Sequence, residues 1–270
     1  MTQVSLLFLE PNDSIRIISE RLGVKHVFMN DFAFLKDKEE LVPVFRSCME
    51  EFWLLIIAII SNRSQFAPIV DDEAEIETEI IQLLFLGPCT HSQLDKHLPS
   101  RLSESPKFES ILKKVSVFKY PGRIEDQGTY SLKDVDQDKI QPYYHHYSPK
   151  DRSVVEEKLK GRRKSLKKDE KEHVPNLPNL IHEPQGTLGE NLDKLVVCDA
   201  FLDILTICLS NTSFYDPLVK ICDNMIDILL YITHIAIQQM VHACHIPAKF
   251  METLEVMKGE KDNQPVCSFS

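Results

Sequence analysis

Apolar residues recur every three or four positions along most of the chain and give way to short alternating runs in one region. Residues 76–84, 94–98 and 108–115 each carry an apolar stripe that predicts a short helix. Gly87, which tolerates a left-handed cap, and Pro88 are expected to end the first helix, and the Thr-x-x-Gln pattern at residues 90–93 predicts a capping box at the second. Runs at 117–120 and 129–132 flank a polar stretch and predict a β-hairpin. Three helices followed by a hairpin are the winged-helix plan, which we assign to residues 75–133.

The segments on both sides of this module also have helical patterns. Residues 1–74 are predicted to be a helical scaffold segment, in which positions 44–60 are apolar around nearly the whole helix. We expect this helix to be buried, with neighbouring segments or another chain supplying part of the cover. Residues 134–171 are predicted to be an aromatic turn and a long charged helix that starts at Ser148 and Pro149.

The remaining third of the chain is predicted to hold a linker, a helical pair and a tail. Prolines and glycines mark residues 172–191 as a linker, and residues 192–246 are predicted to form an antiparallel helical hairpin with a short turn at 211–215. Residues 247–270 read as a polar tail, disordered or truncated. The predicted fold class is therefore mainly α with a small α+β part, a winged-helix module embedded between helical-bundle segments.

Composition narrows the classes of protein to consider. With 270 residues, 43% hydrophobic and 27% charged, the chain has material for one or two domains with a sizeable core. Its seven cysteines form no Cys-x-x-Cys pair, which argues against a disulfide framework or a zinc finger. The formal net charge of -10 argues against a general nucleic-acid binder. The most apolar stretch, 52–60, is shorter than the roughly 20 residues that span a bilayer, so no membrane partner is expected.

The sequence carries no phosphate-binding loop and no GxGxxG, HExxH or GxSxG motif, so no catalytic residue or metal ligand is assigned. His234 and His242 are spaced to share one helix face and could offer nitrogen ligands to a metal, but we favour partly buried core positions. His145 and His146 lie among three tyrosines. Those rings could stack on nucleic-acid bases, but aromatic packing of the winged helix against the next helix is favoured.

Basic side chains are the candidates for partner contact. Between residues 90 and 124 seven basic residues accompany three acidic ones, which gives modest support for nucleic-acid binding. The third helix nevertheless lacks the Arg, Asn and Gln side chains that read base edges. The charged helix after Ser148 is either a solvated face or a docking strip for an acidic partner. The predicted partner-contact surface consists of Lys107, Lys113, Lys114, Lys158, Lys160, Arg162, Arg163, Lys164, Lys167 and Lys168.

Several short motifs follow one another in a defined order along the middle of the chain. They are IIQ at residues 80–82, GPCTHSQL at 87–94, ESIL at 109–112, GTYSLK at 128–133 and YYHHYS at 143–148, preceded by EEFWLL at 50–55. Their order and spacing resemble the winged-helix region of the UBR-family N-recognins, over about residues 49–171. Those proteins are large RING-type E3 ubiquitin ligases of the N-degron, or N-end rule, pathway.

The resemblance implies a role that this sequence fills only in part. The family recognises destabilising N-terminal residues through a zinc-bound UBR box and recruits a ubiquitin-conjugating enzyme through a RING domain, and the sequence has neither cysteine-histidine array. We therefore expect an interior piece of such a ligase or a truncated product, with no cofactor of its own and no activity in isolation. Its implied partners are the rest of the ligase, a ubiquitin-conjugating enzyme and N-degron substrates, in the cytoplasm or the nucleus. The alternative is a winged-helix nucleic-acid-binding protein.

Overall fold

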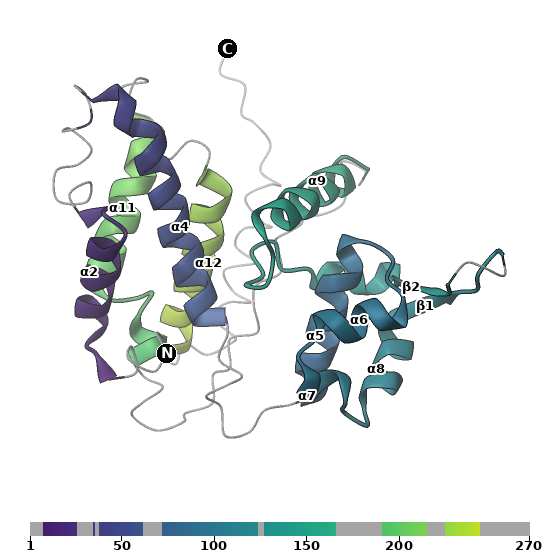
Figure 1. Ribbon diagram of the computed structural model, residues 1–270. Coiled ribbons are helices and arrows are strands. Elements are labelled where there is room, and N and C mark those ends of the chain that lie inside the picture. The colour runs from purple at the N-terminus through teal and green to yellow at the C-terminus, as the bar shows by residue number, and fades with distance from the viewer. Residues whose placement is uncertain are drawn as a thin grey trace, which may run out of the picture.

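The computed structural model describes residues 8–25, 35, 38–61, 72–123, 127–165, 191–214 and 225–243. A helical bundle contains α2 (Pro11–Arg21), the short 3-10 helix η2 (Glu39–Leu41), α4 (Val42–Ser61), α11 (Asp199–Phe214) and α12 (Ile226–Ala243). The second group contains α5 (Asp72–Leu86), α6 (His91–His97), α7 (Ser100–Ser103), α8 (Phe108–Val115), β1 (Ser116–Lys119), β2 (Thr129–Leu132), η3 (Asp134–Lys139) and α9 (Pro149–Ser165). Figure 1 shows the two groups side by side. The predicted fold class, mainly α with a small α+β part, is confirmed.

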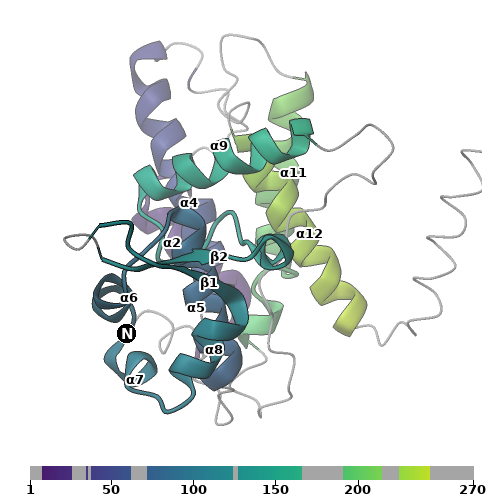
Figure 2. The ribbon, with the colours of Figure 1, turned by 90° about the vertical axis from the view of Figure 1, so that its right-hand side faces the viewer.

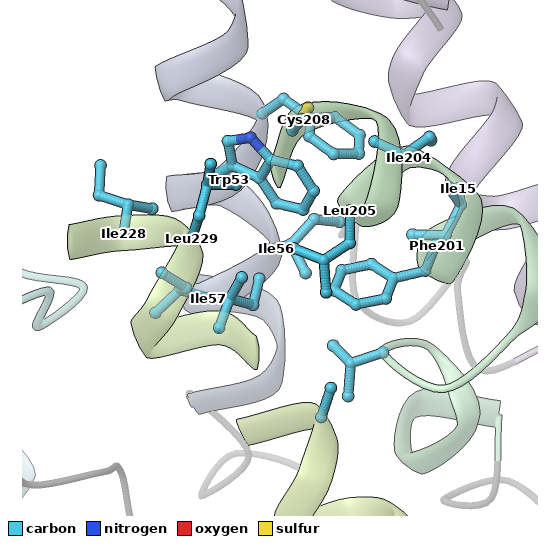
Figure 3. Close-up of a cluster of buried hydrophobic side chains, with 14 of the residues drawn as sticks. Ile15, Trp53, Ile56, Ile57, Phe201, Ile204, Leu205, Cys208, Ile228 and Leu229 are labelled. Atoms are coloured by element: carbon cyan, nitrogen blue, oxygen red, sulfur yellow. The ribbon is translucent and has the colours of Figure 1, made fainter. Parts of the chain in front are cut away.

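Helix α4 lies at the centre of the bundle. Phe52 and Trp53 are completely buried, and the Trp53 ring meets the rings of Phe52 and of Phe201 in α11 edge to face, with centroids 5.0 Å and 5.8 Å away. Figure 3 shows Trp53 among side chains of α11 and α12. Helices of the same chain therefore cover much of this apolar helix, which agrees with the first of the two expected sources, neighbouring segments or another chain.

The two helices after the linker differ from the prediction in their boundaries. Helix α11 begins at Asp199, after a turn at residues 195–197, and its first turn is capped by the Asn12 side chain, which accepts the Ala200 N–H at 2.8 Å. The predicted connecting turn at 211–215 is helical through Phe214, and Asn211 is a buried polar residue within this helix. Residues 215–224, the tail at 247–270 and the linker up to residue 190 lie outside the described part of the chain.

The winged-helix module follows the predicted order. The capping box at the start of α6 is confirmed, since the Thr90 hydroxyl accepts the Gln93 N–H at 3.3 Å and the Gln93 side chain accepts the Thr90 N–H at 2.8 Å. Strands β1 and β2 pair antiparallel from Ser116 opposite Leu132 to Lys119 opposite Thr129. In Figure 2 the hairpin and α6 to α8 lie together below α9.

Two elements of the module were not predicted. The short helix α7 separates α6 from α8. In addition, Cys89 forms a backbone bridge with Tyr130, in which the Cys89 N–H donates to the Tyr130 carbonyl at 3.1 Å and the Tyr130 N–H donates back at 2.8 Å. Residue 89 thus adds a third backbone segment to the edge of the hairpin and ties the end of α5 to the wing.

The end of α5 is capped differently from the prediction. The helix stops at Leu86, before the expected glycine-proline pair, but Gly87 does not adopt the left-handed conformation. The Lys158 ammonium of α9 instead donates hydrogen bonds to the carbonyls of Phe85 and Leu86 at 2.8 Å and 3.0 Å. The Lys158 ammonium therefore satisfies carbonyls at the end of this helix, a role that a glycine in the left-handed conformation often has at other helix ends. None of the described helices is long and apolar enough to span a bilayer.

Candidate functional site

Lys114 of the third helix, and Lys107 at the N-cap of that helix, pair with acidic side chains of the first helix. Lys107 pairs with Glu73 at 2.6 Å, and Lys114 pairs with Glu77 at 2.5 Å. Glu77 also receives Lys139 from η3 at 2.6 Å. Acidic side chains of α5 thus neutralise Lys107 and Lys114, two members of the predicted partner-contact surface.

Glu77 is the most heavily engaged of these carboxylates. Partial burial opposes its ionisation, but hydrogen bonds from Lys114 and Lys139 outweigh that effect and hold the pKa of Glu77 below its usual value. The pKa of Lys139 is raised by its hydrogen bond with Glu77 and, to a smaller extent, by its hydrogen bond with Asp136. The side chain of Glu77 is 19% exposed, so water screens this network less than it screens the outer pair of Lys107.

Two basic residues of α9 line a cavity against the winged helix. Lys158, besides capping α5, lies 5.6 Å from the centre of the Phe85 ring. Lys158 and Arg162 line a cavity of about 320 Å³ together with Gly87, Pro88 and Ser131. Lys158 therefore has a structural role that its position on a charged helix did not reveal.

The other members of the predicted partner-contact surface do not converge on one place in the described structure. Lys113 is exposed on α8, and Lys160 pairs with Glu156 one turn away at 4.0 Å. The four residues whose side chains lie outside the described part of the chain are Arg163, Lys164, Lys167 and Lys168. The partner-contact role of the ten residues stays a prediction.

Gln82 of α5 is a buried polar residue that joins the winged helix to the chain after it. Its amide donates to the Lys139 carbonyl at 3.0 Å, and its side-chain oxygen accepts the Gln141 N–H at 3.1 Å. The Tyr147 hydroxyl donates to the backbone and side-chain oxygens of Gln82, both at 3.0 Å. This one side chain therefore fixes the aromatic turn, residues 141–148, against α5.

The aromatic turn connects the two hydrophobic cores. Tyr144 and Tyr147 are buried in the winged-helix core, whereas Tyr143 belongs to the core of the bundle. Tyr143 contacts Tyr231 of α12, with ring centroids 5.0 Å apart. Burial raises the pKa of Tyr231, and this hydroxyl stays protonated at neutral pH. The preference for aromatic packing agrees with these contacts, and the turn also reaches the bundle.

The two histidines of the aromatic turn gather on Glu79 of α5. His146 Nε2 lies 3.4 Å from Glu79 Oε1, and the rings of His145 and His146 lie 4.0 Å apart between centroids. Ligand atoms of all three residues lie within 4.8 Å of one another. Among the described residues this is the one group of three histidine, cysteine or carboxylate side chains close enough to hold a metal ion.

The charge states of this group follow from its surroundings. Burial opposes the ionisation of Glu79, but hydrogen bonds from His146 and Tyr144 prevail and lower its pKa. Burial lowers the pKa of His145 to about 4, so its imidazole is neutral at pH 7. The hydrogen bond with Glu79 raises the pKa of His146 against the effect of burial.

On another helix, the sequence offers His234 and His242 as possible metal ligands but favours partly buried core positions for them. His234 lies half-buried on α12 and belongs to no group of three metal-ligand side chains among the described residues, and the side chain of His242 lies outside those residues. The residue that could not be associated with His145 and His146 from the sequence is Glu79, which lies 66 positions before His145. Its place among the alternating acidic residues of α5 gave no signal that it faces inward.

These features define a winged-helix module that is joined to a helical bundle and in which Lys107 and Lys114, at the N-cap and on the third helix, pair with the first helix. Residues 75–174 match the family described as "E3 ubiquitin-protein ligase UBR1-like, winged-helix domain". The resemblance of this chain to the UBR family of E3 ubiquitin-protein ligases is therefore confirmed.

Individual relatives extend the similarity beyond the winged helix. E3 ubiquitin-protein ligase UBR2 of Mus musculus is 29% identical over 213 residues, which are 76% of this chain and 12% of that protein. E3 ubiquitin-protein ligase ubr1 of Schizosaccharomyces pombe is 27% identical over 270 residues, 99% of this chain and 12% of the relative. UBR1 of Homo sapiens is 31% identical over 159 residues, 58% of this chain and 9% of the human protein. The chain thus spans about an eighth of the length of the first two relatives.

Proposed function

We propose that this chain provides an interior scaffold for an E3 ubiquitin-protein ligase of the N-degron pathway, which recognises proteins with destabilising N-terminal residues and promotes their ubiquitination and degradation. The similarity to UBR1 and UBR2 ligases over most of the chain supports the ligase class. The scaffold role is supported by the way in which the aromatic turn contributes tyrosines to both hydrophobic cores. A winged helix held in this way sets the distance and angle between the elements attached to it.

The single observation that carries the proposal is the pairing of α8 with α5. In a winged helix that binds DNA, the third helix enters the major groove and its cations meet phosphates. Here Lys107 and Lys114 are already paired with Glu73 and Glu77. Binding DNA would have to break these pairs or bring phosphates next to carboxylates, so a protein-facing role fits the charges better.

The catalytic steps belong to other parts of such a ligase. A RING domain would recruit the ubiquitin-conjugating enzyme, and a zinc-bound UBR box would capture the substrate's N-terminus. The sequence of this chain has no Cys-x-x-Cys pair to build either array. We propose that its work is done in the cytoplasm or the nucleus, as part of the assembled ligase.

Two assays on the purified chain test the proposal. The chain mixed with activating enzyme, conjugating enzyme and ubiquitin should form no conjugates, and appreciable conjugation would contradict the absence of a catalytic module. Titration of labelled duplex DNA should show no binding at micromolar concentrations. Micromolar affinity with the steep salt dependence of phosphate contacts would favour the nucleic-acid alternative.

A further inference from the structure

The aromatic turn and α5 together present three metal-ligand side chains at one place on the surface. Glu79 comes from the middle of α5, and His145 and His146 come from a backbone turn. Adjacent residues on an extended strand point to opposite sides, so two neighbouring histidines seldom face one partner. The turn at residues 145–146 removes this restriction and brings both imidazoles to the same carboxylate.

We propose that Glu79, His145 and His146 form a binding site for a divalent transition-metal ion of the zinc type. Two imidazoles and one carboxylate are a ligand set that zinc accepts, and they leave a fourth position for water. His146 is 56% exposed, so solvent reaches the open side of the site. The expected ion is therefore bound by three protein ligands and one water molecule. This site is independent of the proposed ligase function.

The separation of the ligand atoms fits such an ion. With zinc–ligand bonds of about 2.0–2.1 Å, two ligand atoms at neighbouring corners of a tetrahedron are about 3.3–3.4 Å apart. Glu79 Oε1 and His146 Nε2 lie 3.4 Å apart. All three ligand atoms lie within 4.8 Å of one another, so the third side chain would have to rotate toward the other two to reach the tetrahedral spacing.

A second observation points to a missing partner. His145 Nδ1 is buried and has no hydrogen-bond partner among the described residues. Buried polar atoms are nearly always satisfied, so an orphaned ring nitrogen beside a histidine and a carboxylate calls for an explanation. Coordination of one imidazole nitrogen by a metal, with the ring turned to present it, supplies that explanation.

The backbone around the site is held in place before any ion binds. Gln82 lies one helical turn beyond Glu79 on α5 and accepts the hydroxyl of Tyr147, which follows the histidine pair. Tyr144, which precedes the pair, is buried in the winged-helix core. The turn is thus anchored on both sides of the two histidines, which lowers the cost of ordering the ligands.

The competing explanation is a two-residue ion pair between His146 and Glu79 without a metal. The chain contains such a pair elsewhere, because His91 Nε2 lies 2.7 Å from Glu109 Oε1 and no third histidine, cysteine or carboxylate of the described residues joins it. A pair of this kind needs neither His145 nor zinc. The variant His91→Gln is therefore a matched control for changes at the three-residue site.

The test is zinc binding by the full chain after treatment with a chelator, followed by calorimetry. We expect one Zn²⁺ per chain at micromolar or tighter affinity, a weakening of at least about tenfold in Glu79→Gln and in His145→Gln, and an unchanged affinity in His91→Gln. Co²⁺ bound at the site should lack the strong near-ultraviolet absorption of thiolate ligands, which separates the site from the seven cysteines.

Three outcomes would overturn the proposal. They are no zinc binding by a folded wild-type chain, binding that is equal in Glu79→Gln and wild type, or a thiolate spectrum for the bound Co²⁺. Circular dichroism of each variant confirms that it is folded. Zn²⁺ should also raise the melting temperature of the wild type and of His91→Gln but not that of His145→Gln.

Discussion

The Tyr143 ring meets the Tyr231 ring edge to face, with centroids 5.0 Å apart and planes inclined at 67°. Tyr143 is on the aromatic turn that follows the winged helix, and Tyr231 is on α12 of the bundle. This contact joins the aromatic turn, whose Tyr144 and Tyr147 are buried in the winged-helix core, to the core of the bundle, and its loss should uncouple the two parts.

Replacing Tyr231 with alanine should destabilise the bundle and separate its unfolding from that of the winged helix. Truncating a buried aromatic residue costs about 3–5 kcal/mol, because the cavity that remains is not refilled. Trp53 is the only tryptophan and lies in the bundle core, so its fluorescence reports bundle unfolding. Circular dichroism reports both parts, and the two denaturant curves should no longer coincide in Tyr231→Ala. Tyr231→Phe keeps the ring and should keep the curves together.

Gln82 should be one of the most sensitive polar positions in the winged helix. Replacing it with alanine leaves the Lys139 carbonyl and the Gln141 N–H without their side-chain partner, and unsatisfied buried groups of this kind cost about 1–3 kcal/mol each. We expect a total loss of about 2–4 kcal/mol in the free energy of unfolding, measured in urea. The matched control is Gln137→Ala, which removes only a local contact with Asp134 and should cost less than about 1 kcal/mol. Equal losses in the two variants would contradict the role given to Gln82.

Gly128, just before the second wing strand, lies against the Phe118 ring and leaves no room for a side chain unless the ring moves. A Cβ atom at position 128 would overlap that ring, whose Cε2 atom would be only 2.7 Å away. The ring is 41% exposed and can move outward, so Gly128→Ala should cost only about 1 kcal/mol. Faster hydrogen exchange of β1 and β2 amides would show the local change. In a Phe118→Ala background the glycine substitution should have almost no effect, and an unchanged cost there would exclude the steric explanation.

Stability should fall in acid through Glu77. Its pKa is lower in the folded chain than in the unfolded chain, so its contribution is complete above the unfolded value of 4.5 and is lost as the pH falls through the folded value. Urea unfolding of Glu77→Gln should therefore depend less steeply on pH below about 4.5 than that of the wild type. Glu73→Gln removes a pair whose two side chains are more than half exposed, and should leave the slope nearly unchanged. Parallel slopes for wild type and Glu77→Gln would refute the assignment.

Features that depend on neighbouring residues could be predicted from the sequence. The capping box at residues 90–93 formed as its spacing indicated, and so did the start of α9, where the Asp151 carboxylate accepts the Ser148 N–H at 3.1 Å and the Ser148 hydroxyl accepts the Asp151 N–H at 3.2 Å. Apolar periodicity likewise located the winged helix, because each helix there has one buried face.

Features that depend on distant residues could not be predicted in this way. The Lys158 ammonium caps a helix that ends 72 positions earlier, and the Glu79 carboxylate meets histidines 66 and 67 positions later. Periodicity says that a residue faces inward or outward but not which partner it meets. Asn211 was assigned wrongly from a local signal, because its polarity suggested a turn although it is buried inside α11.

The most direct test of the scaffold proposal exchanges segments between relatives. This chain would replace the matching 12% of the Schizosaccharomyces pombe ligase, with which it aligns over 270 residues. Degradation of a reporter with a destabilising N-terminal residue is then measured in cells that lack the native ligase. We predict that the exchanged ligase degrades the reporter and that the Tyr231→Ala version degrades it much more slowly at equal ligase abundance. A stable, abundant exchanged ligase without activity, or one indifferent to Tyr231→Ala, would contradict the account.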